Sequence, residues 1–255
     1  MSHIVGSNGN DFLNGTNQPD IFIALDGNDT ISGNNGDDVI LAGSGNDTAS
    51  GNNGDDVILA GSGNDTASGN NGSDVVSGGL GNDSLFGNNG DDVLSGDEGN
   101  DNLTGGNGSD VMSGGAGDDT LTLDKDDAFT AGDEGHDTAI LTGTGNFDLR
   151  GELAGLETIS QGSGGATLSL NDLLFTTLEG NKLTIDLDGG NDTVNIFYNG
   201  SLLDFDKGSG EASEVIFGPT GGTLNKSIDF DNVEHLNFTN TATGATGNFD
   251  AWLLG

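Results

Sequence analysis

A nine-residue period runs along the chain from Gly6 to Ile140. Each unit is close to GGxGxDxUx, in which U is a large apolar residue, and residues 33–50 are repeated without change as residues 51–68. A short fixed period is the signature of a repeat architecture, in which every unit stacks on its neighbours. Because the copied block spans two units, two nonapeptides are predicted to make one structural turn.

The sixth position of the unit is almost always an aspartate. Two residues earlier most units have a glycine, which permits a turn with positive φ beside the fixed charge. A carboxylate next to a flexible turn in every unit predicts a row of metal sites. The candidate metal-binding residues are Asp11, Asp20, Asp29, Asp38, Asp47, Asp56, Asp65, Asp74, Asp83, Asp92, Asp101, Asp110, Asp119 and, after one failed unit at residues 123–131, Asp137.

Charge opposes the folding of this chain unless a cation is bound. The sequence has 42 acidic and five basic residues, a formal net charge of -37, 48 glycines and only 31% hydrophobic residues. That composition alone is typical of a disordered, solvating segment, in which carboxylates repel one another. Calcium is the predicted ion, because it takes about six to eight oxygen ligands and the repeat motif offers no thiolate or imidazole.

The period predicts an all-β fold over residues 6–140, a parallel β-solenoid in which each turn consists of two nonapeptides. In each unit the glycine-rich residues form a loop and the next three, such as Val39 to Leu41, form a short strand, with turns about 4.8 Å apart. One apolar residue in nine makes a thin core, so metal binding has to contribute to folding. The eighth positions face inward as two walls: Leu13, Ile31, Ala49, Ala67, Leu85, Leu103 and Leu121, and opposite them Phe22, Ile40, Ile58, Val76, Leu94 and Met112.

Units such as GGLGNDSLF at 78–86 and GGAGDDTLT at 114–122 resemble the nonapeptides of the RTX (repeats-in-toxin, hemolysin-type) family. The resemblance covers slightly over half of the chain. It implies a calcium β-roll, in which each ion is shared between loops of neighbouring turns and held by the sixth-position aspartates and by backbone carbonyls. Two units depart from the pattern: unit 15–23 has Gln18 and Pro19 in its loop, and unit 123–131 has Asp126 for the glycine and Ala128 for the aspartate. The calcium sites expected at the two ends of the roll therefore lack part of the family's ligand pattern.

The resemblance also implies type I secretion, which uses an uncleaved C-terminal signal. Residues 248–255, an acid followed by an apolar cluster, are similar to such signals, and packing of Trp252 and Leu253 on the last coil is the alternative reading. We expect no conventional N-terminal signal peptide before the first repeat, and no stretch has the ~18 apolar residues that a membrane helix needs. We therefore expect a secreted protein, at the surface of a bacterium or outside it.

Residues 141–255 lose the period and form a predicted β-rich C-terminal cap. They either continue the solenoid with irregular loops or close as a small sandwich. The tract from Asp188 to Asp192 resembles a partial repeat and is a further candidate calcium site. Strands are expected at residues 166–170, 183–185, 193–197, 215–217 and 236–238.

An enzyme is not expected. The chain has no cysteine, no GxSxG or HExxH motif, and its three histidines, His3, His136 and His235, are isolated in sequence. Paired acids such as Asp37 and Asp38 recur once per predicted turn, which indicates metal loops and not an acid–base dyad. The acidic balance also argues against nucleic acid and anionic membrane surfaces as partners.

The two outer faces of the predicted roll differ. One is apolar, and we expect it to pack against the C-terminal region or a second copy, unless its β-branched residues are there only because strands favour them. The other bears hydroxyls, which raises ice binding as a remote alternative. The apolar face has Ile21, Val39, Val57, Val75, Val93 and Val111 with Ile23, Leu41 and Leu59; the other has Thr30, Thr48, Thr66 and Ser84 with Ser32, Ser50 and Ser68.

These features predict a calcium-folded extracellular protein with a structural, self-assembling or adhesive role, as in a surface layer, filament or matrix. A second copy, a cell surface or a polysaccharide is the expected partner. The alternative is a secretion and folding module of a larger secreted enzyme or toxin.

Overall fold

The computed structural model of the 255-residue chain describes residues 1–148, 155–161, 166–171, 182–187, 193–198, 202–206, 213–217, 226–231, 235–240 and 246–250. The regular elements in these ranges are all β-strands. No helix in the described ranges has the length and apolarity needed to cross a membrane. The chain divides into two compact units, Met1–Gly135 and His136–Gly255.

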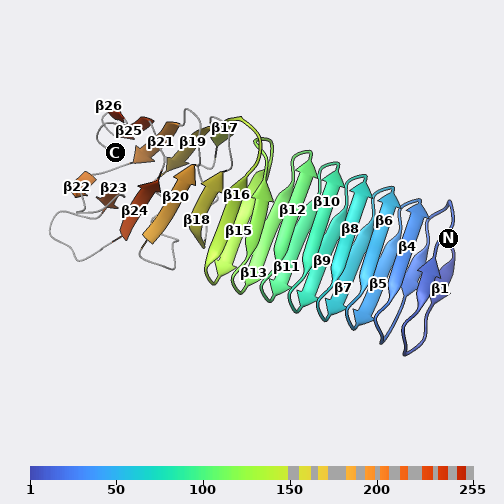
Figure 1. The fold of residues 1–255 in the computed structure, drawn as a ribbon. Helices are drawn as coiled ribbons and strands as arrows, with labels where there is room; N and C mark the ends of the chain where they lie inside the picture. Colours follow the sequence, from blue (N-terminus) through green and yellow to red (C-terminus); the bar gives the residue numbers. More distant parts are fainter. Residues whose placement is uncertain are drawn as a thin grey trace. The chain divides into compact units, whose positions relative to one another are not determined.

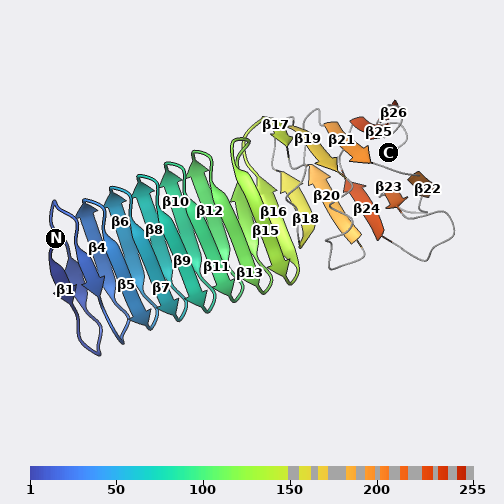
Figure 2. The same cartoon turned by 180° about the vertical axis from the view of Figure 1, so that it is seen from behind.

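The first unit consists of two parallel sheets that the chain visits alternately (Figure 1). Consecutive strands of one sheet are therefore separated by a strand of the other, and Figure 2 shows the same stack from behind. The odd sheet contains β1 (His3–Val5), β3 (Ile21–Ile23), β5 (Val39–Ser44), β7 (Val57–Ser62), β9 (Val75–Leu80), β11 (Val93–Glu98), β13 (Val111–Ala116) and β15 (Ala128–Glu134). The even sheet contains, in this unit, β2 (Phe12–Asn14), β4 (Thr30–Asn35), β6 (Thr48–Asn53), β8 (Thr66–Asn71), β10 (Ser84–Asn89), β12 (Asn102–Asn107) and β14 (Thr120–Leu123).

Each strand pairs in parallel with the strand two nonapeptides further along the chain. Val39 lies opposite Val57 in the odd sheet, and Thr48 lies opposite Thr66 in the even sheet. This register confirms the predicted parallel β-solenoid, with two nonapeptides in each turn. The strands are longer than expected from sequence, because backbone hydrogen bonds between turns continue into the loop, as from the Gly36 N–H to the Asn53 carbonyl at 2.8 Å.

The core of the roll is the space between the two sheets, and the predicted eighth-position residues fill it. Ile40, Ile58 and Leu85 are fully buried, whereas Leu13, in the first turn of the even sheet, is half-buried. The first position of each unit also faces inward, and it is occupied by small residues such as Ala42 and Gly51. The core is therefore only two side chains deep per strand, and one of the two is small.

The predicted register is wrong by one residue in unit 123–131. Val111 pairs with Ala128 and not with Phe129, so this unit has one residue fewer before its strand. The sixth-position place that was assigned to Ala128 is taken by Asp127, whose Oδ1 accepts the N–H of Asp110. A β-bulge between Met112 and Ser113 restores the spacing of the other turns, because it pairs Ser113 with Ala131.

The second unit continues parallel pairing without the nonapeptide period. Its strands form two rows, and in each row the strands at the end of the order pair antiparallel. The strands expected from sequence at 166–170, 183–185, 193–197, 215–217 and 236–238 are all present. In order, the rows are β16 (Asp137–Leu141), β18 (Leu156–Gln161), β20 (Lys182–Leu187), β24 (Lys226–Asp231), β23 (Ser213–Phe217) and β22 (Leu202–Asp206); and β17 (Gly145–Asp148), β19 (Ala166–Asn171), β21 (Thr193–Tyr198), β25 (His235–Asn240) and β26 (Thr246–Asp250).

Two sequence predictions lie outside the described residues. They are the partial repeat from Asp188 to Asp192 and the final residues of the secretion-signal candidate, 251–255.

Candidate metal centre

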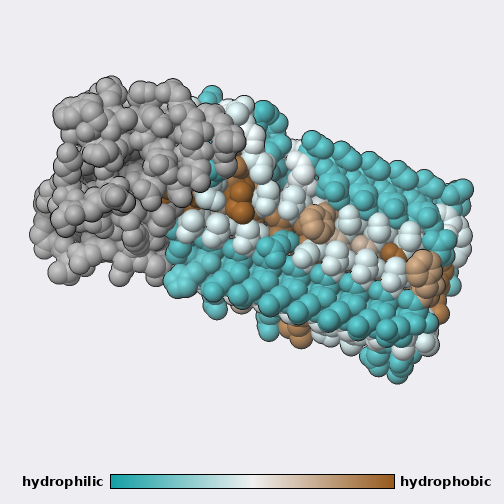
Figure 3. Space-filling model, in the orientation of Figure 1, coloured by the Kyte–Doolittle hydropathy of each residue, from teal (hydrophilic) through white to brown (hydrophobic). Residues whose placement is uncertain are grey.

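The sixth-position aspartates lie at the two edges of the roll, where the chain passes from one sheet to the other. Along both edges Figure 3 shows hydrophilic bands, with a paler strip of strand surface between them. The aspartates themselves are buried beneath this surface: Asp20 is fully buried, Asp29 to Asp119 are at most 2% exposed, and Asp137 is fully buried. Asp11, in the first turn, is half-buried. Burial of so many carboxylates requires a partner for each of them.

One oxygen of each carboxylate has a structural partner in the neighbouring turn. The backbone N–H of Asp38 donates to Oδ1 of Asp56 at 2.7 Å, and the N–H of Asp56 donates to Oδ1 of Asp74 at 2.7 Å. The same bond recurs from Asp11 to Asp29 and onward to Asp119. The aspartates from Asp20 to Asp119 thus link their turn to the one before it through Oδ1.

The second oxygen has no hydrogen-bond partner in most turns, although it is buried. A buried carboxylate oxygen without a donor is costly, so this atom calls for a cation or a proton. The oxygens concerned are Oδ2 of Asp29, Asp38, Asp47, Asp56, Asp65, Asp74, Asp83, Asp92, Asp101 and Asp110.

A glycine five residues earlier leaves the space into which each Oδ2 points. A Cβ on Gly51 would overlap Oδ2 of Asp56, and a Cβ on Gly33 would overlap Oδ2 of Asp38. The same point at Gly33 lies 2.7 Å from the carbonyl oxygen of Gly51, in the next turn. A carboxylate oxygen and a backbone carbonyl oxygen therefore converge where a side chain would otherwise be, and both are calcium ligands.

Burial makes these carboxylates hard to ionise without a cation. It raises the pKa of Asp56, Asp65, Asp74, Asp92 and Asp101 to about 6, against a hydrogen bond from the preceding aspartate that lowers it. Burial also raises the pKa of Asp38, Asp47, Asp83 and Asp110. A bound divalent cation would favour the ionised form and reverse this shift.

Three carboxylates are hydrogen-bonded by their own loops instead. Oδ2 of Asp20 accepts the N–H and the hydroxyl of Thr16, both at 2.8 Å, and Oδ2 of Asp11 accepts the N–H and hydroxyl of Ser7. Burial acts on Asp20 as well, but the hydrogen bonds from Ser2 and Thr16 outweigh it and lower its pKa to about 2. These carboxylates are satisfied without a metal.

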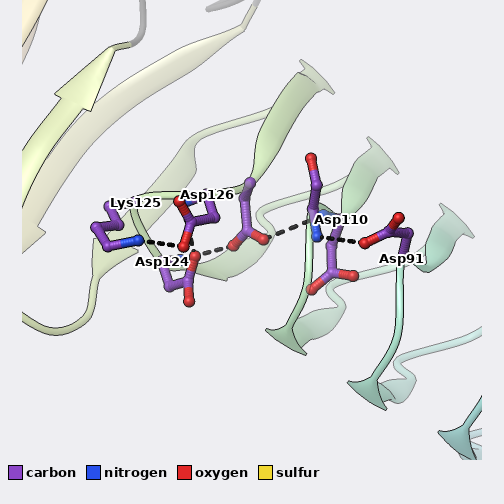
Figure 4. Close-up of polar contacts among 7 residues, drawn as sticks. Asp91, Asp110, Asp124, Lys125 and Asp126 are labelled. Atoms are coloured by element: carbon purple, nitrogen blue, oxygen red, sulfur yellow. Dashed lines mark hydrogen bonds and ion pairs between the residues drawn. The ribbon is translucent and has the colours of Figure 1, made fainter.

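The third is Asp127, in the loop that is one residue short. Figure 4 shows Asp124, Lys125 and Asp126 of this loop together with Asp110. Its Oδ2 accepts the N–H of Asp124 at 2.6 Å, while Asp126 pairs with Lys125 and donates its own N–H to Asp124. Burial, together with the nearby charge of Asp110, raises the pKa of Asp127. In the loop that departs most from the sequence pattern, the second carboxylate oxygen of Asp127 is therefore hydrogen-bonded within the loop itself.

The fifth position has a role that the sequence did not reveal. The side-chain oxygen of Asn46 accepts the N–H of Asn64 at 2.9 Å, and Asp37 and Asp55 accept N–H groups in the same way at the other edge. These bonds point toward the following turn, opposite to those of the sixth position. The preference for asparagine or aspartate at position five was the available signal.

The donor set at the edges fits calcium. Over the described residues, no three or more His, Cys, Asp or Glu side chains gather closely enough to hold a metal, so a site here depends on backbone carbonyls as well as on aspartates. The available donors are oxygens alone, which suits a hard cation.

The family model of the RTX calcium-binding nonapeptide repeat matches residues 3–18, 14–49, 32–67, 50–85, 68–103, 86–121 and 104–139. Together these matches cover more than half of the chain. The chain belongs to the RTX calcium-binding repeat family. Its repeats bind calcium, and their number implies several ions. No curated protein sequence matches the chain.

The residues that match the RTX repeat, 3–139, also contain the buried aspartates from Asp20 to Asp137. The match ends at residue 139, shortly after Asp137, the last of the predicted sixth-position aspartates. Membership of the family thus accounts for the roll, and the second unit has to be understood from its own residues.

Proposed function

We propose that this protein is an exported, non-enzymatic structural protein that folds outside the cell when calcium binds along both edges of the roll. The observation that carries the proposal is the row of buried carboxylates whose second oxygen has no donor. Such an arrangement is unfavourable in a calcium-poor compartment and favourable in a calcium-rich one.

The folding switch follows from charge and spacing. Aspartates of one edge follow each other at the ladder spacing of about 4.8 Å, so ionised neighbours repel strongly in the buried edge. Extracellular calcium modules have dissociation constants of about 10⁻⁴ to 10⁻³ M, so their sites stay empty at cytosolic calcium levels. The chain would therefore be unfolded and able to thread through a type I exporter before it meets external calcium.

The outer surface of the odd sheet supports a role in assembly. Leu59, Val75 and Val93 are each 43% exposed and lie in neighbouring turns of that sheet. Val75 lies opposite Val93, and Leu59 is two residues from Val57, the partner of Val75 on the other side. Contiguous exposed apolar residues are typical of interaction sites on soluble proteins. We infer that this face of the odd sheet associates with the same face of a second copy once calcium has neutralised the edges.

The test is sedimentation velocity of the full chain with and without calcium, on wild type and two double variants. Val75→Asp with Val93→Asp introduces charge into the odd face, and Thr48→Asp with Thr66→Asp introduces the same charge at exposed positions of the even face. We expect calcium-dependent association that the valine variant loses and the threonine variant keeps. A folded wild type that stays monomeric at saturating calcium would contradict assembly and favour a folding module of a larger protein.

A further inference from the structure

Glu157 occupies the place of a sixth-position aspartate in the second unit, although it lies outside the nonapeptide period. It lies on β18, and its Oε2 accepts the backbone N–H of Asp137 at 2.8 Å. In the roll, the aspartates from Asp11 to Asp101 donate the same backbone N–H to the carboxylate of the next turn at 2.7 to 2.8 Å. Asp137 is fully buried, so this bond is shielded from water.

The second oxygen of Glu157 also repeats the pattern of the roll. Oε1 is buried and has no hydrogen-bond partner, as with Oδ2 of Asp56. No lysine, arginine or histidine forms an ion pair with Glu157 among the side chains that the structure describes. One oxygen is used by the fold and the other is left for a cation, which is the division found at the calcium-site aspartates.

A bulge explains how a glutamate reaches this place although it follows Asp137 at a wider spacing than one regular turn. Asp137 pairs with Leu156, and Thr138 pairs with Thr158, so Glu157 is the extra residue. Bulges re-aim the side chain of the inserted residue. Leu156 and Ile159 are both fully buried, which fixes the strand on either side of Glu157.

The contrast with Asp20 separates a metal ligand from a carboxylate that the fold already satisfies. Both oxygens of Asp20 accept hydrogen bonds, from Ser2 and from Thr16. Among the described residues, Glu157 accepts a hydrogen bond from Asp137 at Oε2 and none at Oε1. A carboxylate with one free, buried oxygen suits calcium, which accepts carboxylate oxygens in irregular geometry.

We propose that Glu157 is a calcium ligand, so that calcium binding is not confined to the nonapeptides and includes a site in the second unit. This inference depends on calcium binding by the repeats and not on export or assembly. It adds one site that the repeat pattern does not contain, and it ties the order of β16 and β18 to calcium.

The test compares Glu157→Gln with Glu134→Gln by native mass spectrometry of the full chain at saturating calcium. Glutamine at 157 keeps an oxygen for the Asp137 N–H but removes the charge, whereas Glu134 is exposed and serves as the charge-matched control. We expect the variant at 157 to bind one calcium fewer than wild type, and the variant at 134 to bind the wild-type number. Equal counts in all three would overturn the proposal for Glu157 while leaving the repeat sites intact.

A second measurement decides the matter if Glu157→Gln does not fold. Crystals of the wild-type chain grown in calcium should show an anomalous calcium peak about 2.3–2.6 Å from a Glu157 carboxylate oxygen. A Glu157 carboxylate that binds no ion in crystals whose repeats are loaded would overturn the assignment. Crystals or spectra without calcium anywhere in the roll would instead contradict calcium folding as a whole, and this proposal with it.

Discussion

Asp56 accepts the backbone N–H of Asp38 at Oδ1 at 2.7 Å and directs Oδ2 into the space beside Gly51. The two oxygens of one carboxylate thus serve different purposes. Oδ1 holds two turns in register, and Oδ2 is available to a cation. Because the same residue does both, loading the edge with calcium and stacking the turns are coupled.

Replacing Asp56 with asparagine should weaken calcium binding and leave the ladder intact. The amide oxygen can still accept the Asp38 N–H, but the charge and one ligand oxygen are lost. We expect calcium affinity at this site to fall about tenfold or more, which is about 1.4 kcal/mol. Isothermal titration calorimetry measures it. Asp55→Asn is the control, since Asp55 is exposed and its side chain accepts the Ser73 N–H; an equal loss in both variants would refute a specific role for Asp56.

Adding a methyl group at Gly51 should disrupt the same site by sterics alone. The new Cβ would overlap the Asp56 carboxylate, and overpacking of this kind costs about 1–3 kcal/mol. Gly9→Ala is a matched control, because nothing lies within 4 Å of its Cβ position. Chemical denaturation in calcium should show a lower unfolding free energy for Gly51→Ala only. Two variants of equal stability would mean that the space beside Gly51 is not part of a site.

Asp20→Asn should not change the number of calcium ions bound. Oδ2 of Asp20 already accepts the Thr16 N–H and hydroxyl, so the expected cost is a modest loss of stability at the first turns. The comparison is Asp38→Asn, one turn along the same edge, where Oδ2 has no donor and one ion should be lost. Native mass spectrometry counts the ions. Loss of an ion from the Asp20 variant would show that calcium displaces Thr16.

Without calcium, the roll should be more stable at acidic pH. The pKa of Asp56, Asp65, Asp74, Asp92 and Asp101 is raised to about 6 in the folded state, from the ordinary value of 3.8. The folded state therefore holds more protons, and the stability they contribute is complete below pH about 4 and is lost as pH rises through about 6. Circular dichroism in calcium-free buffer should show β-structure at pH 4.5 that decreases by pH 7.

Calcium should reverse this dependence, because it replaces the protons on the same oxygens. In saturating calcium the β-signal should persist at pH 7, and calcium affinity should fall as pH drops below about 6. A β-signal that is independent of pH in calcium-free buffer would contradict the placement of these carboxylates.

The regular part of the fold was predictable because each nonapeptide carries the same local information. The period, the inward-facing positions such as Ile58 and Leu85, and the placement of the aspartates along two edges follow from spacing alone. The sequence-based register fails where a loop differs in length or conformation from the regular nonapeptide. Asp127 takes the place assigned to Ala128 because the loop is one residue shorter. The hydrogen bonds from Thr16 to Asp20 were likewise not predictable from the spacing, and the role of Asp20 as a metal ligand stays a prediction.

The position of Glu157 could not be predicted from the nonapeptide spacing either. It follows Asp137 at a wider spacing than the regular repeat, and only the bulge between β16 and β18 brings it into the row. Its position depends on tertiary pairing, which no nonapeptide pattern encodes. The segment LETI gave no signal of this beyond a carboxylate at the start of a strand.

Small-angle X-ray scattering across a calcium titration, with magnesium as the control, tests the central claim most directly. We predict an expanded chain in calcium-free buffer at pH 7 that compacts to the folded form as calcium is added. Magnesium should not substitute at equal concentration, because it demands smaller, near-octahedral sites. A scattering curve that does not change with calcium would contradict the account.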